Sequence, residues 1–242
     1  MKKRWFQNRI SLLLFTAALI LTVFSGRLHG QGWIIYDGSM MPNKGTPPFA
    51  STMSEFNAAY NKIVIDTLVP GNKWLWMDTG TAVALQYKWS MDFADKGATF
   101  DEITVVMRVR GHAHRDHVVD FDMQFNERRT RVSILTATRQ PRPRRGRAPF
   151  VVLRASLTNW NILRFTMTAT EARMYLNENP QPAMTIIPAD NLGSPNRHFR
   201  FGDGDTGNTF GADIDWMIWD TTGAYSPGEG TPVPTKLISS GV

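Results

Sequence analysis

Apolar residues recur at every second position along most of this chain. The pattern is clearest in the segments "DEITVVMRVRG", "HVVDFDMQF", "TRVSILTAT", "FVVLRASL", "ILRFTMTA" and "ARMYLNEN", which turn-forming residues separate. Successive side chains of a β-strand point to opposite faces of its sheet, so this alternation predicts half-buried strands. No window has the spacing of a long amphipathic helix. The sequence therefore predicts an all-β fold, an antiparallel β-sandwich or barrel.

The first part of the chain, residues 1–30, has the composition of a secretory signal peptide. It opens with the basic stretch "MKKRWFQNR", runs apolar over residues 10–24 and ends in small residues at Ser25, Gly26 and Gly30. Its apolar core is too short for a comfortable membrane span. We expect cleavage after Gly30 or, alternatively, after Gly26. The mature protein is then secreted, extracellular or periplasmic, and has no membrane partner. The chain has no cysteine, which excludes a lipoprotein anchor.

Removal of this segment changes the charge of the protein. Residues 1–30 hold five basic residues and no acid, so the formal net charge falls from +6 for the whole chain to +1 for the mature chain. Binding to nucleic acid needs a retained surplus of Lys and Arg, so we expect no nucleic-acid partner. Without cysteine, the mature protein must be stabilised by burial and not by disulfides. A single domain of about two hundred residues buries roughly 70% of its unfolded surface, which is enough.

The last third of the chain resembles a known family. The segment "NWNILRFTMTATEARMYLNENPQPAMTI" is similar to a two-strand unit of laminin G-type jelly rolls, in the concanavalin A-like lectin and glucanase superfamily. The segment "FRFGDGDTGNTFGADIDWMIWDTTGAYSPGE" resembles the closing segment of that superfamily. The resemblance implies a concanavalin A-like jelly roll, an antiparallel β-sandwich, over residues 31–228, with an extended tail or linker end at 229–242. It does not select an activity, because this fold hosts lectins, glycosidases, lyases and adhesion modules.

The segment "ADIDWMIWD" predicts a strand between two different surfaces. Strict alternation divides its residues between two faces. One face holds Asp213, Asp215, Met217 and Trp219, and the other holds Ile214, Trp216 and Ile218. Sugar polymers lie on the concave sheet in this superfamily, so the resemblance implies a ligand-binding role for Asp213, Asp215 and Trp219.

The segment from His112 to His117 has the spacing H-x-H-x-D-H, the zinc signature of the metallo-β-lactamase family. That fold needs further His ligands downstream, and only His198 follows. Its alternation of strands and helices is also missing from the sequence pattern, so we interpret the match as chance. A zinc or copper site that uses His112 and His114 stays open. The alternative is a polar turn with solvated histidines.

The segment "VVDFDMQF" alternates apolar side chains with Asp120, Asp122 and Gln124. It resembles the strand Glu-x-Asp-x-Glu of laminarinase- and lichenase-type sandwich glycosidases. The resemblance makes Asp120 the nucleophile and puts Gln124 in place of the proton donor. A glutamine cannot titrate, so it cannot protonate a leaving group. We therefore interpret the three residues as ligand contacts or structural residues.

A second catalytic hypothesis is a polysaccharide lyase, which needs a cation beside a uronate carboxylate and a base that abstracts a proton. The sequence offers these residue types in Arg108, Arg110, His112, His114 and Tyr175. The signature strings of the alginate-lyase families of this fold are missing from the sequence. The alternative is that the two arginines pair with Asp120 and Asp122 across neighbouring antiparallel strands.

The segment "GDGDTGN" is a candidate calcium site. Asp203, Asp205 and Asn208 lie in a Gly-rich turn and could offer oxygen ligands to a structural Ca²⁺. The spacing differs from that of an EF-hand. Tight turns select the same residue types for backbone reasons, which is the alternative explanation.

Two further features suit a carbohydrate partner. Trp74 and Trp76 share a strand face in "KWLWMD", as do Tyr87 and Trp89 in "LQYKWSM", and aromatic rings stack on sugar rings. The insert "RQPRPRRGRAP" holds five arginines and no acid. Guanidinium groups bind carboxylates and sulfates, so an acidic polysaccharide is a candidate partner of this insert, and a solvated loop is the alternative.

These features favour a secreted, carbohydrate-contacting jelly-roll module that binds a polysaccharide or glycan without catalysis. The first alternative is an extracellular lyase that acts on an acidic, uronate-containing polysaccharide. The second is a structural adhesion or interaction module.

Overall fold

The computed structural model describes most of the chain after residue 32. It describes residues 33–51, 59–69, 71–80, 88–93, 100–125, 127–135, 150–154, 157–190, 197–203 and 209–229. The chain from Gly32 onward forms one compact unit. The signal peptide expected at 1–30 and the tail expected beyond Glu229 lie outside the described residues, and both stay predictions. Among the described residues, no helix is long and apolar enough to cross a membrane.

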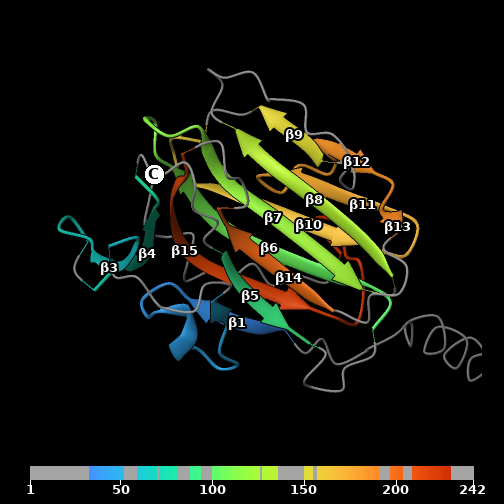
Figure 1. Ribbon diagram of the computed structural model, residues 1–242, viewed down its shortest axis with the longest axis horizontal. Coiled ribbons are helices and arrows are strands. Elements are labelled where there is room, and N and C mark those ends of the chain that lie inside the picture. Colours follow the sequence, from blue (N-terminus) through green and yellow to red (C-terminus); the bar gives the residue numbers. More distant parts are fainter. Residues whose placement is uncertain are drawn as a thin grey trace, which may run out of the picture. The chain divides into compact units, whose positions relative to one another are not determined.

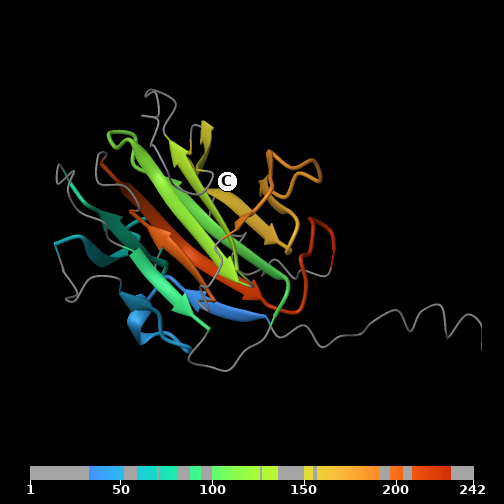
Figure 2. The same cartoon turned by 45° about the vertical axis from the view of Figure 1, so that its right-hand side comes forward.

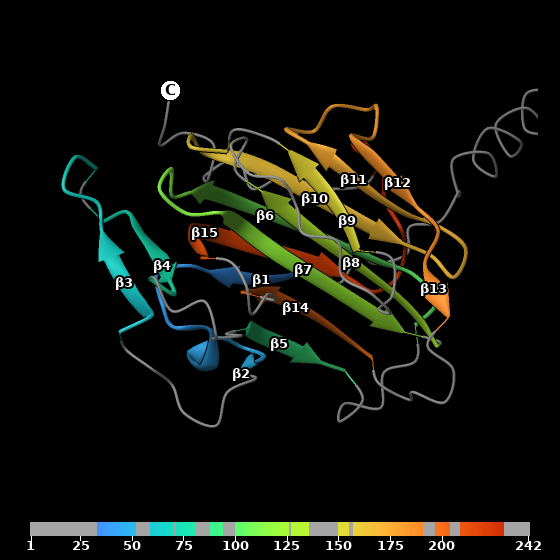
Figure 3. The same ribbon diagram turned by 45° about the horizontal axis from the view of Figure 1, so that its top comes forward.

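The described strands form two sheets (Figure 1). The first, sheet A, has the order β12-β11-β10-β6-β15-β4-β3, and β1 also pairs with β15. Its strands are β1 (Ile34–Asp37), β3 (Asn61–Ile65), β4 (Lys73–Asp78), β6 (Ile103–Gly111), β10 (Asn161–Met167), β11 (Ala172–Leu176), β12 (Met184–Ile186) and β15 (Gly211–Asp220). All of these pairs are antiparallel. Figure 3 shows β3 and β12 at opposite edges of the sheet.

The second sheet, sheet B, has the order β13-β8-β7-β14-β5-β2. Its strands are β2 (Ala50–Ser51), β5 (Lys88–Asp92), β7 (His117–Phe125), β8 (Arg128–Leu135), β9 (Phe150–Arg154), β13 (Ala189–Asp190) and β14 (His198–Gly202), and the short helix η1 (Pro42–Lys44) precedes β2. Strand β9 pairs with β8 in parallel, and the other pairs are antiparallel. The two sheets lie in two layers (Figure 2). The predicted all-β fold and antiparallel β-sandwich are confirmed.

The core lies between the facing sides of the two sheets. In β7 the apolar residues of the alternating pattern, among them Phe121 and Met123, are all buried in the main hydrophobic cluster, as the sequence predicts. The ring of Phe121 stacks on that of Phe165 in β10, with centroids 4.2 Å apart and planes at 7°. Because β7 belongs to sheet B and β10 to sheet A, this contact joins the two layers.

Strand β15 departs from strict alternation. Its register against β6 shifts between Ile214 and Trp216, so the side chains change face at this irregularity. Ile214 and Trp219 both lie in the main core, and Trp219 packs edge-on against Phe199 with centroids 5.4 Å apart. Trp216 lies in a separate apolar cluster with Ile218. The prediction that Trp219 shares a face with Asp213 and Asp215 is wrong, because one extra residue in the strand reverses the alternation.

The pairing of Arg108 and Arg110 with Asp120 and Asp122, the alternative to the lyase hypothesis, is also wrong. The two arginines lie in β6, whose neighbours are β10 and β15 of sheet A. The two aspartates lie in β7, whose neighbours are β8 and β14 of sheet B. The connection after β6 crosses from one sheet to the other, so these consecutive strands are not neighbours in a sheet.

Residues 222–229, here called the C-terminal strap, cross part of the outer face of sheet A, the face turned away from sheet B. The backbone N–H of Tyr225 donates to Thr104 Oγ1 at 2.7 Å, and its carbonyl accepts from Arg164 Nη1 at 3.1 Å. The hydroxyls of Tyr175 and Ser226 lie 3.1 Å apart. The strap therefore covers Arg164 and Tyr175, both of which are buried.

Candidate functional site

A row of charged and aromatic side chains crosses the outer face of sheet A. We call it the outer row, and it consists of Lys62, Trp76, Asp213, Arg110 and Trp160. The strand register places Lys62 opposite Trp76, Trp76 opposite Asp213, and Asp213 opposite Arg110. The guanidinium carbon of Arg110 lies 4.7 Å from the ring centroid of Trp160, which precedes β10. Leu75 and Met77, which alternate with Trp76 in β4, are buried in the core, so the row faces away from sheet B.

Three tryptophans of this face, Trp74, Trp76 and Trp160, are half-buried, and two of them contact each other. Trp74 lies two residues before Trp76 in β4, and its ring meets that of Trp160 edge-on, with centroids 5.9 Å apart. Lys62 Nζ lies 4.3 Å from the ring centroid of Trp76. Arg110 is 5.3 Å from the Trp74 ring centroid. Packing of cations against the rings fixes the positions of the indoles while part of each remains exposed.

Two ion pairs join β6 to β15 on this face. Arg110 donates through Nε and Nη2 to Asp213 Oδ2, at 3.0 and 2.6 Å. Arg108 donates to Asp215, and its guanidinium carbon lies 4.8 Å from the Trp160 ring centroid. Burial raises the pKa of Asp215 above its ordinary value, and the hydrogen bond from Arg108 opposes that change. Each candidate arginine thus has a carboxylate partner on the next strand.

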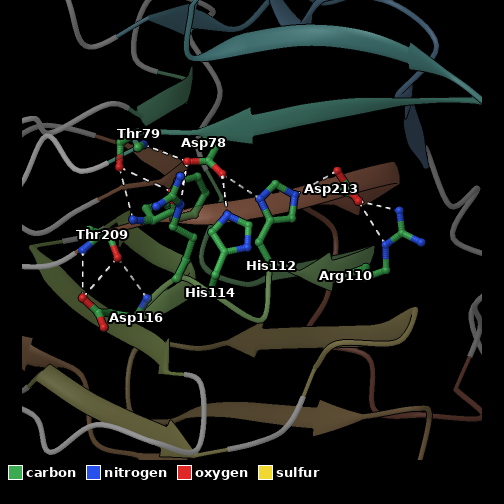
Figure 4. Close-up of polar contacts among 11 residues, drawn as sticks. Asp78, Thr79, Arg110, His112, His114, Asp116, Thr209 and Asp213 are labelled. Atoms are coloured by element: carbon green, nitrogen blue, oxygen red, sulfur yellow. Dashed lines mark hydrogen bonds and ion pairs between the residues drawn. The ribbon is translucent and has the colours of Figure 1, made fainter.

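His112 lies between two carboxylates (Figure 4). It is beside the middle of the outer row, with its ring centroid 5.8 Å from that of Trp76. Its Nδ1 is 3.0 Å from Asp78 Oδ2 and its Nε2 is 3.1 Å from Asp213 Oδ1. His114 Nε2 lies 3.6 Å from the same Asp78 oxygen. Burial disfavours the charged imidazole, but the hydrogen bonds to Asp213 and Asp78 outweigh it and raise the pKa of His112 to about 9. At neutral pH His112 is therefore charged and joins β4 to β15.

The structure separates the residues of the H-x-H-x-D-H spacing. Asp116 Oδ2 accepts hydrogen bonds from the backbone N–H and the hydroxyl of Thr209, at 3.2 and 3.1 Å. His117 lies in β7, where its Nδ1 is 3.4 Å from Asp120 Oδ1. His112 and His114 instead lie beside Asp78, with which they form the group of possible metal ligands among the described residues. This arrangement agrees with the argument against a metallo-β-lactamase centre.

Asp120, Asp122 and Gln124 lie on the outer face of sheet B and are buried. Arg129 donates to both oxygens of Asp122, at 3.0 and 2.7 Å, while His198 Nε2 is 3.9 Å away. Burial favours the neutral acid, but His198 and Arg129 outweigh it and hold the pKa of Asp122 far below its ordinary value. Burial also lowers the pKa of His198, so Arg129 is the partner that carries the charge. Asp122 is thus part of a buried ion pair.

Asp120 differs from Asp122. Neither of its carboxylate oxygens has a hydrogen-bond partner among the described residues, although His117 lies 3.4 Å away. A buried carboxylate without hydrogen bonds is costly, and such groups often mark a place where a ligand or water belongs. A ligand-contact role stays a prediction for Asp120, and also for Gln124.

The residues of the lyase hypothesis are divided between two environments. Arg108, Arg110 and His112 lie around β6 and are bound to aspartates. Tyr175 lies in β11, beyond β10, where its hydroxyl contacts Ser226 under the C-terminal strap. Tyr175 is therefore not an exposed base that could abstract a proton beside these arginines.

Several candidate residues lie wholly or partly outside the described part of the chain. Of the calcium candidates, Asp203 is described and buried, whereas Asp205 and Asn208 lie outside the described residues. Tyr87 and the arginine-rich insert at 139–149 also lie outside the described residues. Trp89 is described, but it is a core residue whose Nε1 donates to Asn61 Oδ1 at 3.1 Å. It is not a sugar platform.

Comparisons with known proteins give similarity of fold only. No protein-family model and no curated protein matches the sequence. Among solved structures, alginate lyase vAL-1 from Chlorella virus is 11% identical, covering 66% of this chain and 89% of its own, with a TM-score of 0.40. The Emp46p carbohydrate recognition domain is 11% identical, covering 76% and 93%, with a TM-score of 0.39. A Trypanosoma rangeli sialidase is 14% identical, covering 81% of this chain and 31% of its own, with a TM-score of 0.45. None of these likenesses assigns a function to a residue of this chain.

Three residues of this face were not candidates on sequence grounds. Lys62, Asp78 and Trp160 come from three separate segments, and the sheet order brings them to one face. In "NWNILRF" the sequence marks Trp160 only as the residue that opens a strand. Nothing local indicates that Asp78 lies beside His112, since 34 positions separate the two residues.

Proposed function

We propose that this chain is a secreted carbohydrate-binding module and that its glycan lies along the outer row of sheet A. The observation that carries the proposal is the grouping of three half-buried tryptophans, Trp74, Trp76 and Trp160, with guanidinium groups on one sheet face. Indole rings stack on the apolar faces of sugars, and the charged groups between them can bind hydroxyls. Secretion rests on the signal-peptide composition of residues 1–30.

The charges of this face favour binding over catalysis. Arg108, Arg110 and His112 are each bound to an aspartate, which fixes their positions before a ligand arrives. Preorganised groups of this kind lower the entropy cost of binding. A general base needs a free acceptor at the reacting proton, and the aspartates of this row are already engaged.

An acidic glycan is the ligand class that we expect. Lys62 is exposed, and the Arg110 side chain is 33% exposed, so their cationic groups can reach a carboxylate. Guanidinium groups bind carboxylates through paired hydrogen bonds. Asp213 and Asp215 then act mainly by orienting the arginines.

Affinity gel electrophoresis of the mature protein against uronate-containing and neutral polysaccharides tests the proposal. We expect retardation by at least one acidic polymer. Trp160→Ala should weaken binding by about fivefold, since an aromatic contact contributes roughly 1 kcal/mol. Trp33→Ala is the matched control, because Trp33 contacts Tyr225 of the C-terminal strap and packs against the separate cluster of Val106, Trp216 and Ile218.

Two outcomes would contradict the proposal. Equal retardation of wild type and Trp160→Ala would move the glycan to another surface. A rise in the absorbance of unsaturated uronates with any polymer would replace the binding module by a lyase. Near-UV circular dichroism of both variants shows whether the sandwich is intact.

A further inference from the structure

We propose that Asp78, His112 and His114 bind a divalent transition-metal ion, with Zn²⁺ as the probe. The three side chains offer one carboxylate oxygen and two imidazole nitrogens, which lie within 4.8 Å of one another. Figure 4 shows both imidazole rings directed toward the same carboxylate. Imidazole and carboxylate are ordinary ligands of Zn²⁺, and three protein ligands leave a position for water or another ligand. Because a ligating imidazole nitrogen must be deprotonated, Zn²⁺ at Nδ1 of His112 displaces to solvent the proton that this nitrogen shares with Asp78.

The spacing of the ligand atoms suits a tetrahedral ion. Zn²⁺ bonds to nitrogen and oxygen of these lengths place adjacent ligand atoms about 3.3–3.5 Å apart. Asp78 Oδ2 lies 3.0 Å from His112 Nδ1 and 3.6 Å from His114 Nε2. The His114 side chain is 67% exposed, so small rotations of it can adjust the distance between the ligand nitrogens of His112 and His114.

Further hydrogen bonds orient the side chains of His112 and Asp78, as the hydrogen-bond partners of ligands do in metal sites. His112 Nε2 lies 3.1 Å from Asp213 Oδ1, and Arg110 holds the other oxygen of Asp213. This is the carboxylate–histidine arrangement that fixes the tautomer and ring orientation of a metal-binding imidazole. Asp78 Oδ1 accepts from Arg115 Nε and from the backbone N–H of Gly80, both at 2.7 Å. Its Oδ2 therefore faces the histidines.

Gly211 provides the space for this arrangement. It lies opposite Asp78 in the β4–β15 ladder, and a Cβ at this position would lie 2.6 Å from His112 Nδ1. A larger residue would displace the imidazole from the carboxylate. The glycine at position 211 therefore allows His112 Nδ1 to lie beside Asp78.

Isothermal titration of the mature, tag-free, chelator-treated protein with Zn²⁺, in the absence of glycan, tests the site. We expect about one ion per chain. His114→Ala should weaken binding at least tenfold, since loss of one of three ligands costs as much as or more than loss of an outer-shell partner, which is about 10-fold to 100-fold. This variant removes an exposed side chain, so the fold is retained. Asp78→Asn should weaken binding similarly, and Glu171→Gln, at the turn before β11, is the control that should leave it unchanged.

A second readout uses Co²⁺ in place of Zn²⁺. A tetrahedral site gives Co²⁺ a visible absorption spectrum, which His114→Ala should weaken or shift. Binding that survives both ligand substitutions would place the ion elsewhere and overturn the proposal, as would the absence of binding at millimolar Zn²⁺. These results are independent of the glycan proposal, because no polysaccharide is present.

Discussion

The outer faces of sheets A and B carry the same local pattern, an aspartate at every second position, in two different environments. On sheet A, Asp213 and Asp215 lie among half-buried tryptophans, and exposed cations border them. On sheet B, the side chain of Asp122 is 1% exposed, against 6% for Asp213, and it lies among Arg129, Arg131 and His198. Polar residues alone therefore do not mark a binding surface. Under the proposed function, the half-buried tryptophans beside the aspartates distinguish the outer face of sheet A.

Replacement of the two aspartates should separate their roles most clearly. Asp122→Asn should lower the free energy of unfolding by about 3 kcal/mol, because it leaves Arg129 and Arg131 beside a neutral side chain in a buried layer. Asp213→Asn should cost less, about 1–2 kcal/mol, because the Arg110 side chain is 33% exposed and can turn to solvent, whereas His112 keeps its second carboxylate, Asp78. Urea unfolding of the two matched variants measures both values. Equal losses would mean that the two faces are energetically alike.

The pH dependence of stability should distinguish the same pair. The pKa of Asp122 is held far below its ordinary value, so its ionisation stabilises the fold above the unfolded pKa of about 3.9, and this contribution is lost as the pH falls through the folded pKa. The difference in unfolding free energy between wild type and Asp122→Asn should therefore shrink by about 1 kcal/mol between pH 7 and pH 3. A difference that stays constant over this range would refute a depressed pKa at Asp122.

The smallest effect is expected at the edge of the outer row. Lys62 is exposed and contacts the Trp76 ring, so Lys62→Ala should weaken binding of an acidic glycan about twofold to threefold and leave stability nearly unchanged. Lys73→Ala on the adjacent strand is the control, because Lys73 is also exposed and lies outside the row. Affinity electrophoresis at low and high salt measures the effect. A loss as large as that of Trp160→Ala would shift the centre of the site toward β3.

The strands of this fold could be predicted from the sequence because alternation is a local property. The apolar face of β7 and the all-β sandwich follow from it directly. The face of Trp219 could not be predicted, because the irregularity between Ile214 and Trp216 has no sequence signature that distinguishes it from regular alternation. The histidines of the proposed metal site were visible as candidates, but their carboxylate partner Asp78 was not.

The sequence by itself determined where the chain extends, which side chains of most strands turn inward, and that stability must come from burial without disulfides. Only the tertiary structure decided that β6 and β7 belong to different sheets, that Arg108 and Arg110 meet Asp215 and Asp213, and that His112 reaches Asp78. The physical reason is that alternation depends on each residue and its immediate neighbours, whereas strand order depends on competition among all pairings that bury the same apolar faces. A single inserted residue or a crossover between sheets changes the partners of a side chain while leaving its local pattern the same.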